Sequence, residues 1–168
     1  MDSEHLLIGL DGGATKISGW EISYDTHSKV FSLGNLHAER SYSQIPGFLS
    51  GFKPVDIKKQ LEERDRGLIT QTDEEKQQES VYVEACAQVV EEIFSESKAP
   101  SILLGLGMPG LKTENKRGIA VVANGPRMIH YSDMLEKRLE LVHINMKSPV
   151  KHIGSDADYC GIGENYAA

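Results

Sequence analysis

The chain has 168 residues, the length of about one domain. Its 18 lysines and arginines stand against 25 aspartates and glutamates, a formal net charge of −7, and 39% of its residues are hydrophobic. This composition supports a folded core and argues against a disordered chain. It also argues against nucleic-acid binding, which needs clustered cations. No apolar run approaches the roughly 18 residues of a membrane span, and the acidic first residues predict no secretory signal.

The two cysteines, Cys86 and Cys160, have neither a Cys-x-x-Cys partner nor a Cys/His spacing typical of metal sites. The six histidines are scattered along the chain. We therefore expect reduced thiols and a cytoplasmic protein.

The first part of the chain predicts three successive strands. Apolar residues alternate in strand period from residue 6 to residue 10, and 17–24 and 29–37 also have the composition of strands. A glycine-rich bend at 11–16 and a turn at 25–28 separate them. Such closely connected strands are expected to pair antiparallel.

Residues 39–72 show little periodicity and contain prolines, glycines and a charge run at 62–66. This composition predicts a solvated insertion with one short helix around 55–65. Because long loops are often part of a functional site, a substrate lid is the alternative interpretation.

Beyond residue 72, helices and strands alternate. Thr72 and Glu75 have the spacing of a capping box at the start of a helix that Pro100 ends. Strands are expected at 101–106, 119–122 and 149–154, and helices over 132–142 and 156–168. Together with the initial strands, these elements predict a single mixed α/β domain over 1–168.

The segment 105–110 matches the Gly-x-Gly-x-x-Gly pattern of dinucleotide sites. The polar residues 111–118 that follow lack helical apolar spacing, and Pro109 disfavours a helical residue before it. We therefore expect no dinucleotide site. The phosphate-binding Walker pattern also fails, because no glycine precedes Lys16.

A second glycine-rich stretch follows the first strand and carries Asp11, Gly12, Gly13, Thr15 and Lys16. Glycines let backbone amides approach phosphate oxygens, and successive amides in a tight turn form an anion-binding nest. Asp11 can hold a hydrated Mg²⁺. A plain hairpin turn is the alternative, because Asp-Gly is a common turn signal.

A third stretch places Asp156 where a strand is expected to end and a helix to begin. Sites in α/β sheets favour the carboxyl ends of strands. An aspartate with an ordinary pKa of about 3.9 is ionised at neutral pH, so it can accept a proton from an attacking hydroxyl in phosphoryl transfer. The alternative is that Ser155 or Asp156 caps a helix.

In their order and spacing, these stretches resemble the amino-terminal domain of ROK-family sugar kinases, within the actin-like, hexokinase-like ATPase superfamily. Residues 10–16 resemble the family's first phosphate motif, and 105–110 resembles its Gly-x-Gly-x-Pro-Gly loop. Residues 155–157, with Glu164 further on, resemble its Asn-Asp-Ala step. The resemblance covers most of the chain outside 39–72 and implies a ribonuclease H-like, actin-like ATPase fold.

The resemblance implies the amino-terminal half of an ATP-dependent kinase for a hexose or amino sugar, with Asp156 as general base. The residues facing the ATP phosphates and Mg²⁺ would be Asp11 (through water), Gly12, Gly13, Thr15 and Lys16. The sugar-binding residues would be Pro109, Gly110, Asn124, Ser155 and Glu164.

The chain departs from the family pattern in two respects. Ser155 occupies the position where the family has Asn. Because serine makes fewer hydrogen bonds than asparagine, the resemblance does not fix the identity of the sugar or its affinity. The second kinase domain, which would complete the ATP site, is absent from the sequence. We therefore expect the chain to be inactive alone, and its exposed apolar wall to favour homo-oligomers.

Two other functions are consistent with the sequence. A non-catalytic sugar-binding or regulatory relative would share these motifs; since only residues 1–10 precede Asp11, no DNA-binding module is expected ahead of it. A ribonuclease H-like nuclease could use Asp11 and Asp156 around two metals, but the acidic charge argues against it. The kinase hypothesis requires these two aspartates to converge on one cleft.

Overall fold

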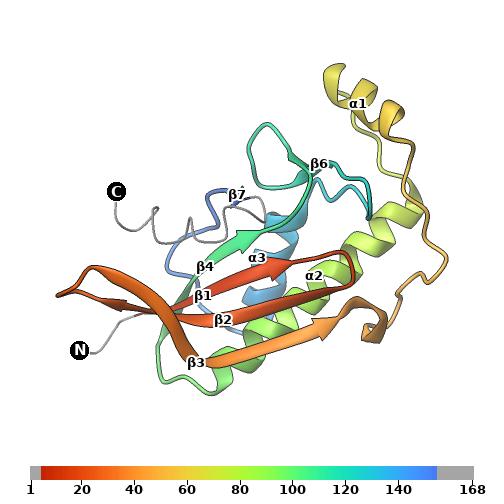
Figure 1. Ribbon diagram of the computed structural model, residues 1–168. Coiled ribbons are helices and arrows are strands. Elements are labelled where there is room, and N and C mark those ends of the chain that lie inside the picture. The colour runs from red at the N-terminus through yellow and green to blue at the C-terminus, as the bar shows by residue number, and fades with distance from the viewer. Residues whose placement is uncertain (1–4, 155–168) are drawn as a thin grey trace.

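The computed structural model describes residues 5–154. Its centre is a five-stranded sheet in the order β3-β2-β1-β4-β7 (Figure 1). The strands are β1 His5–Gly12, β2 Lys16–Asp25, β3 Val30–Ser41, β4 Ser101–Gly107 and β7 Ile153–Gly154. β2 pairs antiparallel with both β1 and β3, whereas β1, β4 and β7 run parallel. The predicted mixed sheet that begins with three antiparallel strands is confirmed.

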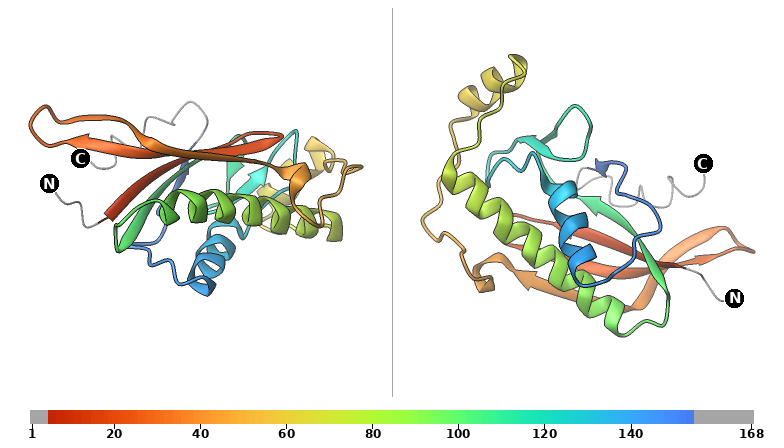
Figure 2. Two further views of the ribbon diagram at one scale, coloured as in Figure 1. Left: turned by 90° about the horizontal axis from the view of Figure 1, so that it is seen from below. Right: turned by 180° about the vertical axis from the view of Figure 1, so that it is seen from behind.

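The helices α2 Asp73–Ser95 and α3 Tyr131–Leu141 lie on the same face of the sheet (Figure 2). Leu10 of β1 is fully buried there, as are Val89 and Ile93 of α2. Gly19 of β2 lets the helix come close, because a Cβ at this position would lie 2.7 Å from Val89 Cγ1 and 2.9 Å from Leu10 Cδ2. This face holds the core.

The predicted capping box at the start of α2 is confirmed. The backbone amide of Glu75 donates to Thr72 Oγ1 at 3.1 Å, and that of Thr72 donates to Glu75 Oε1 at 2.9 Å. Two amides that the first helical turn leaves free are thereby satisfied.

A small antiparallel hairpin follows the main sheet's β4, formed by β5 Leu111–Lys112 and β6 Ile119–Val121. The strand expected at 119–122 is present, but it pairs with β5, which the sequence did not predict. Gly110 makes the turn into β5 with a φ of 105°, and a Cβ there would lie 2.5 Å from Val121 O. The segment 105–110 therefore leads into a strand, whereas a dinucleotide site would need a helix to begin there.

The region 39–72 contains the expected short helix, α1 Ile57–Asp65, together with the single turn η1 Tyr42–Gln44. The expectation of a solvated insertion is wrong at several positions. Tyr42 is buried because its ring stacks on that of Tyr82 in α2, with centroids 3.7 Å apart. Gln60 is buried because its amide binds the backbone of Val122.

The strand expected over 149–154 is confined to β7, Ile153–Gly154. Side chains satisfy the backbone before it: the amide of Val150 donates to Glu136 Oε2 at 2.8 Å, and Arg117 Nη1 donates to Val150 O. These bonds stand in place of a strand ladder. The helix predicted over 156–168 lies outside the described residues.

Within residues 5–154, no helix combines the length and apolar character that crossing a membrane requires.

Candidate functional site

A cavity of about 650 Å³ opens where β1 and β4 end. Residues that the sequence analysis assigned to a site line it from three separate segments: Gly12, Gly13, Pro109, Gly110 and Asn124. The wall between them is largely apolar, with Met108, Val121 and Met128 among its members. The structure thus brings together the glycine turn, the loop 108–110 and the loop 123–126.

The turn between β1 and β2 is held by two tyrosines beneath it. The Tyr82 hydroxyl donates to Ala14 O at 3.3 Å, and the Tyr42 amide donates to Thr15 O at 3.0 Å. Because the two tyrosine rings are stacked and buried, they fix the turn from the core side. Burial also raises the pKa of both tyrosines, so both stay neutral.

The turn has the features of an anion site. The amide of Gly13 donates to Lys16 O at 2.9 Å, whereas those of Ala14 and Thr15 have no hydrogen-bond partner among residues 5–154. Gly13 is exposed, and a Cβ there would meet only Lys16 O, at 3.5 Å. Free amides in a tight turn can bind phosphate oxygens.

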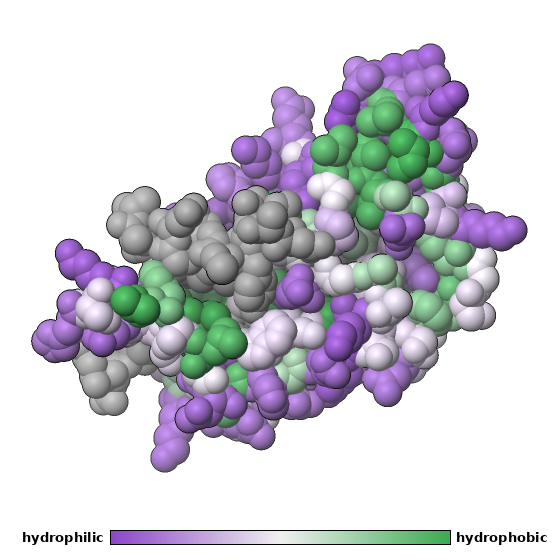
Figure 3. Space-filling model, viewed as in Figure 1, coloured by the Kyte–Doolittle hydropathy of each residue, from purple (hydrophilic) through white to green (hydrophobic). Residues whose placement is uncertain are grey.

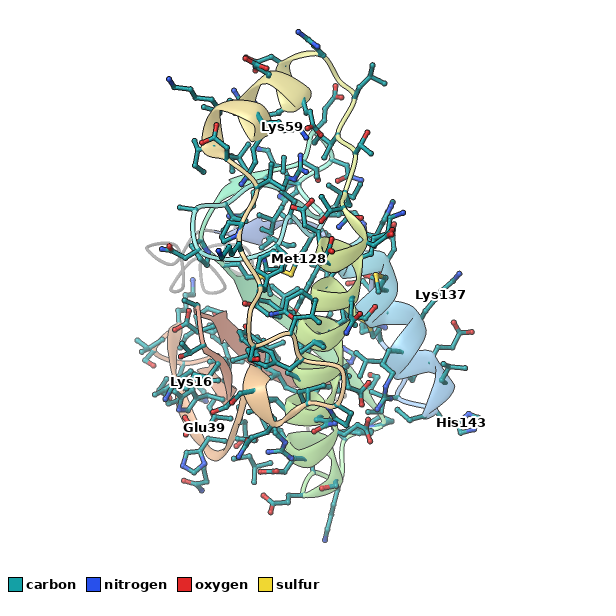
Figure 4. All side chains as sticks on the ribbon, turned by 90° about the vertical axis from the view of Figure 1, so that its right-hand side faces the viewer. Lys16, Glu39, Lys59, Met128, Lys137 and His143 are labelled. Carbon is teal, nitrogen blue, oxygen red and sulfur yellow. The ribbon has the colours of Figure 1, made fainter. Side chains whose placement is uncertain are left out.

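Two residues predicted for the phosphate site do not line the cavity. Thr15 lines a neighbouring recess and not the cavity. Lys16 lines neither space, and its ammonium pairs with Glu39 Oε2 at 3.0 Å on the exposed surface. Figure 4 shows Lys16 and Glu39 together, well away from Met128 of the cavity wall.

Asp11 lies in a row across the carboxyl end of the sheet. It pairs with Gly107 of β4, which pairs with Gly154 of β7. Two strand spacings separate the first and last members, a distance of about 10 Å. The half-buried Asp11 does not line the cavity, and strand alternation turns its side chain to the face opposite that of Leu10. The predicted site residues Ser155, Asp156 and Glu164 lie outside the described residues.

The described part of the chain holds no group of three or more His, Cys, Asp or Glu side chains that could bind a metal. Mg²⁺ is commonly bound through one or two carboxylates, with waters and substrate phosphates completing its shell. A single carboxylate at Asp11 fits that requirement.

The loop that carries Asn124 is fixed at its start by α1. The amide of Val122 donates to Gln60 Oε1 at 2.8 Å, and Gln60 Nε2 donates to Val122 O at 3.0 Å. The glutamine side chain therefore acts as a strand partner would. In the same helix, Ile57 lines the cavity directly.

The end of this loop is fixed by a buried arginine. Arg127 is fully buried, and its Nε and Nη2 donate to the two carboxylate oxygens of Glu75, each at 2.8 Å. Its Nη1 donates to Glu63 Oε1 at 2.9 Å, and Gln71 Nε2 donates to Arg127 O at 2.7 Å. Burial tends to raise the pKa of Glu75, but hydrogen bonds from Arg127 and from the Thr72 amide outweigh it and leave that pKa lowered.

Local sequence patterns did not predict a structural role for Arg127. Glu63 lies in a charge run that was expected to be solvated, and Glu75 has the spacing of a capping residue. The one signal available was a single arginine beside the apolar residues 128–129, which does not identify partners more than fifty positions away.

Lys112 is a further residue that the sequence analysis did not assign to the site. Its ammonium donates to Met108 O and to Gly110 O, each at 2.7 Å. These bonds hold the loop 108–110 in the shape that lines the cavity.

No protein-family model matches the chain, and no curated protein sequence matches it significantly. Solved structures do match. The inorganic polyphosphate/ATP-glucomannokinase of Arthrobacter sp. strain KM is 21% identical, with a TM-score of 0.55, and the match covers 95% of this chain and 47% of that chain. A candidate sugar kinase from Cytophaga hutchinsonii is 13% identical, with a TM-score of 0.52, and the match covers 96% and 39%. A ROK family glucokinase from Streptomyces griseus is 13% identical, with a TM-score of 0.44, and the match covers 88% and 33%.

The chain thus spans less than half the length of each of these three proteins. At these identities the likeness establishes the fold. The ribonuclease H-like, actin-like ATPase fold expected from the sequence is confirmed, and the chain shares it with part of two sugar kinases.

Proposed function

We propose that this chain is the amino-terminal half of a ROK-type kinase that transfers a phosphoryl group from ATP to a hydroxyl of a hexose or amino sugar. The Arthrobacter structure of the same fold is by name a glucomannokinase that uses polyphosphate or ATP. Because the chain spans less than half of that kinase, residues outside it would complete the nucleotide site. The chain alone is then inactive.

The observation that carries the proposal is the meeting of three loops at the carboxyl end of the sheet. Residues 12–14 of the glycine turn, the loop 108–110 and the loop 123–126 border the same cavity. Asp11 and Gly154 lie in one row at that end. Asp156, the proposed base, follows Gly154 by two positions in the sequence.

In this proposal the cavity holds the sugar, with Asn124 and the turn at Pro109 and Gly110 as its contacts. The sugar hydroxyl oxygen forms a bond to the γ-phosphorus of ATP while the bond to the ADP oxygen breaks. The hydroxyl proton passes to the Asp156 carboxylate. Positioning and charge neutralisation supply most of the rate acceleration in such transfers.

Asp11 would hold Mg²⁺ through water near the phosphates, and the ion would neutralise charge on the phosphate oxygens. The free amides of Ala14 and Thr15 would bind those oxygens from the turn. Since Lys16 pairs with Glu39, a role for its ammonium in the site requires that ion pair to open.

The test is isothermal titration of this chain with glucose, mannose, glucosamine and MgATP. Asn124→Ala should weaken sugar binding about tenfold through the loss of one or two net hydrogen bonds. The matched control is Asn35→Ala, because Asn35 is also exposed but lies on β3, away from the cavity lining. This variant should bind sugar normally. Failure of every sugar to bind the unaltered chain would refute the proposal.

A non-catalytic sugar-binding relative is the second candidate, because the proposed sugar contacts Pro109, Gly110 and Asn124 line the cavity whereas the proposed Mg²⁺ ligand Asp11 does not. Both candidates predict sugar binding, so phosphoryl transfer must separate them. In the protein that contains this chain with its second kinase domain, Asp156→Asn should retain sugar affinity and lose transfer. Normal turnover in that variant would exclude Asp156 as the base.

Self-association is part of the proposal. Exposed apolar side chains gather over α1 and the segment after it (Figure 3), where Leu68 is 72% exposed and Ile57 38%. Apolar surface of this kind favours contact with another protein surface. Light scattering should therefore detect oligomers.

We also propose a cytoplasmic location, because an ATP-dependent sugar kinase is expected there.

A further inference from the structure

A second recess, of about 370 Å³, lies between the glycine turn and the segment 43–54 that follows β3. It adjoins the cavity, because the same four residues line both spaces: Ala14, Tyr82, Asn124 and Gly125. Asn124 therefore stands at the boundary between the two. A ligand seated in the cavity would therefore have the recess beside it.

The recess wall is held in place by α2. Gln78 accepts from the amide of Leu49 at 2.9 Å and donates to the carbonyl of Leu49 at 3.3 Å. Gln77 donates to Gly47 O at 2.7 Å. Both glutamines bind backbone groups, so the wall is formed before any ligand arrives.

The lining combines aromatic rings with neutral polar groups. Phe48 and Phe52 are both half-buried, so part of each ring stays accessible. The hydroxyls of Thr15, Ser43 and Ser50 have no hydrogen-bond partner within residues 5–154. Among the described residues, no Asp, Glu, Lys or Arg belongs to the lining. Such a surface suits a ring that has an apolar face and hydroxyl edges, whereas the carboxylate of a sugar acid would find no cationic side chain to pair with.

We propose that the recess is a subsite for a second sugar ring, so that the substrate class is a neutral disaccharide or longer saccharide. This inference rests on the proposed function, which seats the reacting sugar in the cavity. The reacting ring lies in the cavity and the next ring contacts Phe48 and Phe52. Asn124 is in reach of both rings because it lines both spaces.

The test compares glucose and mannose with neutral disaccharides built from them, by isothermal titration on this chain. At least one disaccharide should bind about tenfold more tightly than its parent sugar, the effect of one or two added net hydrogen bonds. Ser50→Trp, which narrows the recess, and Phe52→Ala, which removes a ring, should each abolish that gain. Both variants should bind monosaccharides normally.

Ser32→Trp is the matched control, at an exposed serine of β3 that lines neither space. It should keep the disaccharide gain, and circular dichroism checks that each variant is folded. If monosaccharides bind but no disaccharide gains, or if the gain survives both recess variants, the subsite is refuted while the kinase proposal stands. If neither class of sugar binds the unaltered chain, both proposals fall.

Discussion

The buried ion pair between Arg127 and Glu75 is predicted to contribute strongly to stability. Replacing Arg127 by Met leaves the Glu75 carboxylate, whose side chain is 1% exposed, without its charged partner. Breaking a buried pair on one side costs about 3–5 kcal/mol. Since a domain of this kind has a free energy of unfolding of about 5–15 kcal/mol, the loss is a large part of the total.

A second substitution separates lost charge pairing from lost packing. Glu75→Gln removes the negative charge, while its side-chain carbonyl can still accept the Thr72 amide in the capping box. Arg127→Met combined with Glu75→Gln should therefore be more stable than Arg127→Met alone. The coupling between directly contacting groups is expected at roughly 0.5–3 kcal/mol.

Urea denaturation followed by circular dichroism measures these free energies. Arg64→Met is the matched control, because the Arg64–Asp65 pair lies on the surface and should contribute less than about 1 kcal/mol. Hydrogen exchange at 122–128 should also accelerate in Arg127→Met, since the loop loses the bonds that hold its end. Equal costs for the Arg127 and Arg64 variants would refute this account of the buried pair.

Other outcomes can be checked on the same chain. Gly13→Val should keep the fold, because a Cβ at this position meets only an ordinary van der Waals contact, but it should lower the affinity for MgATP. The control is Gly51→Val, because a Cβ there has no atom within 4 Å. Unchanged MgATP affinity in Gly13→Val would contradict the assignment of the turn to the phosphates. Hydrogen bonds from an arginine lower the pKa of Glu84 below the unfolded value, so its stabilisation is present above that value and is lost as pH falls. Glu84→Gln should flatten the decline of the urea midpoint between about pH 5 and pH 3, and an unchanged slope would contradict this. Burial raises the pKa of Cys86 to about 12. In a Cys160→Ser variant, in which Cys86 is the remaining thiol, a thiol reagent should modify Cys86 only after the protein unfolds. Modification of the folded variant would contradict the burial of Cys86.

The parts of the fold that the sequence predicted depend on signals between near neighbours. Alternation of Leu6, Ile8 and Leu10 identified β1, and these three side chains are buried together. The capping box identified the start of α2 from residues 72–75. The glycine turn was recognised because its chemistry is contained in consecutive residues.

The parts that the sequence missed depend on distant partners. The sequence suggests that Gln60 lies on the surface of a helix, whereas the structure shows that its side chain bonds to the backbone of Val122. The sequence likewise does not show that Glu39, from the neighbouring strand, lies opposite the ammonium of Lys16. Both contacts join residues far apart in the sequence, so local composition could not predict them.

In the loop around Asn124, the residues that stabilise the fold differ from the residue proposed to contact the ligand. Its ends are fixed by hydrogen bonds that join buried polar groups, Gln60 with the backbone of Val122 and Glu75 with Arg127. Between these ends the Asn124 side chain is exposed and has no hydrogen-bond partner among residues 5–154. Substitution at this position should therefore change what the cavity binds at little cost to folding, whereas substitution of the anchoring groups should move the loop and weaken the fold together. A loop built in this way lets ligand preference vary on a constant scaffold.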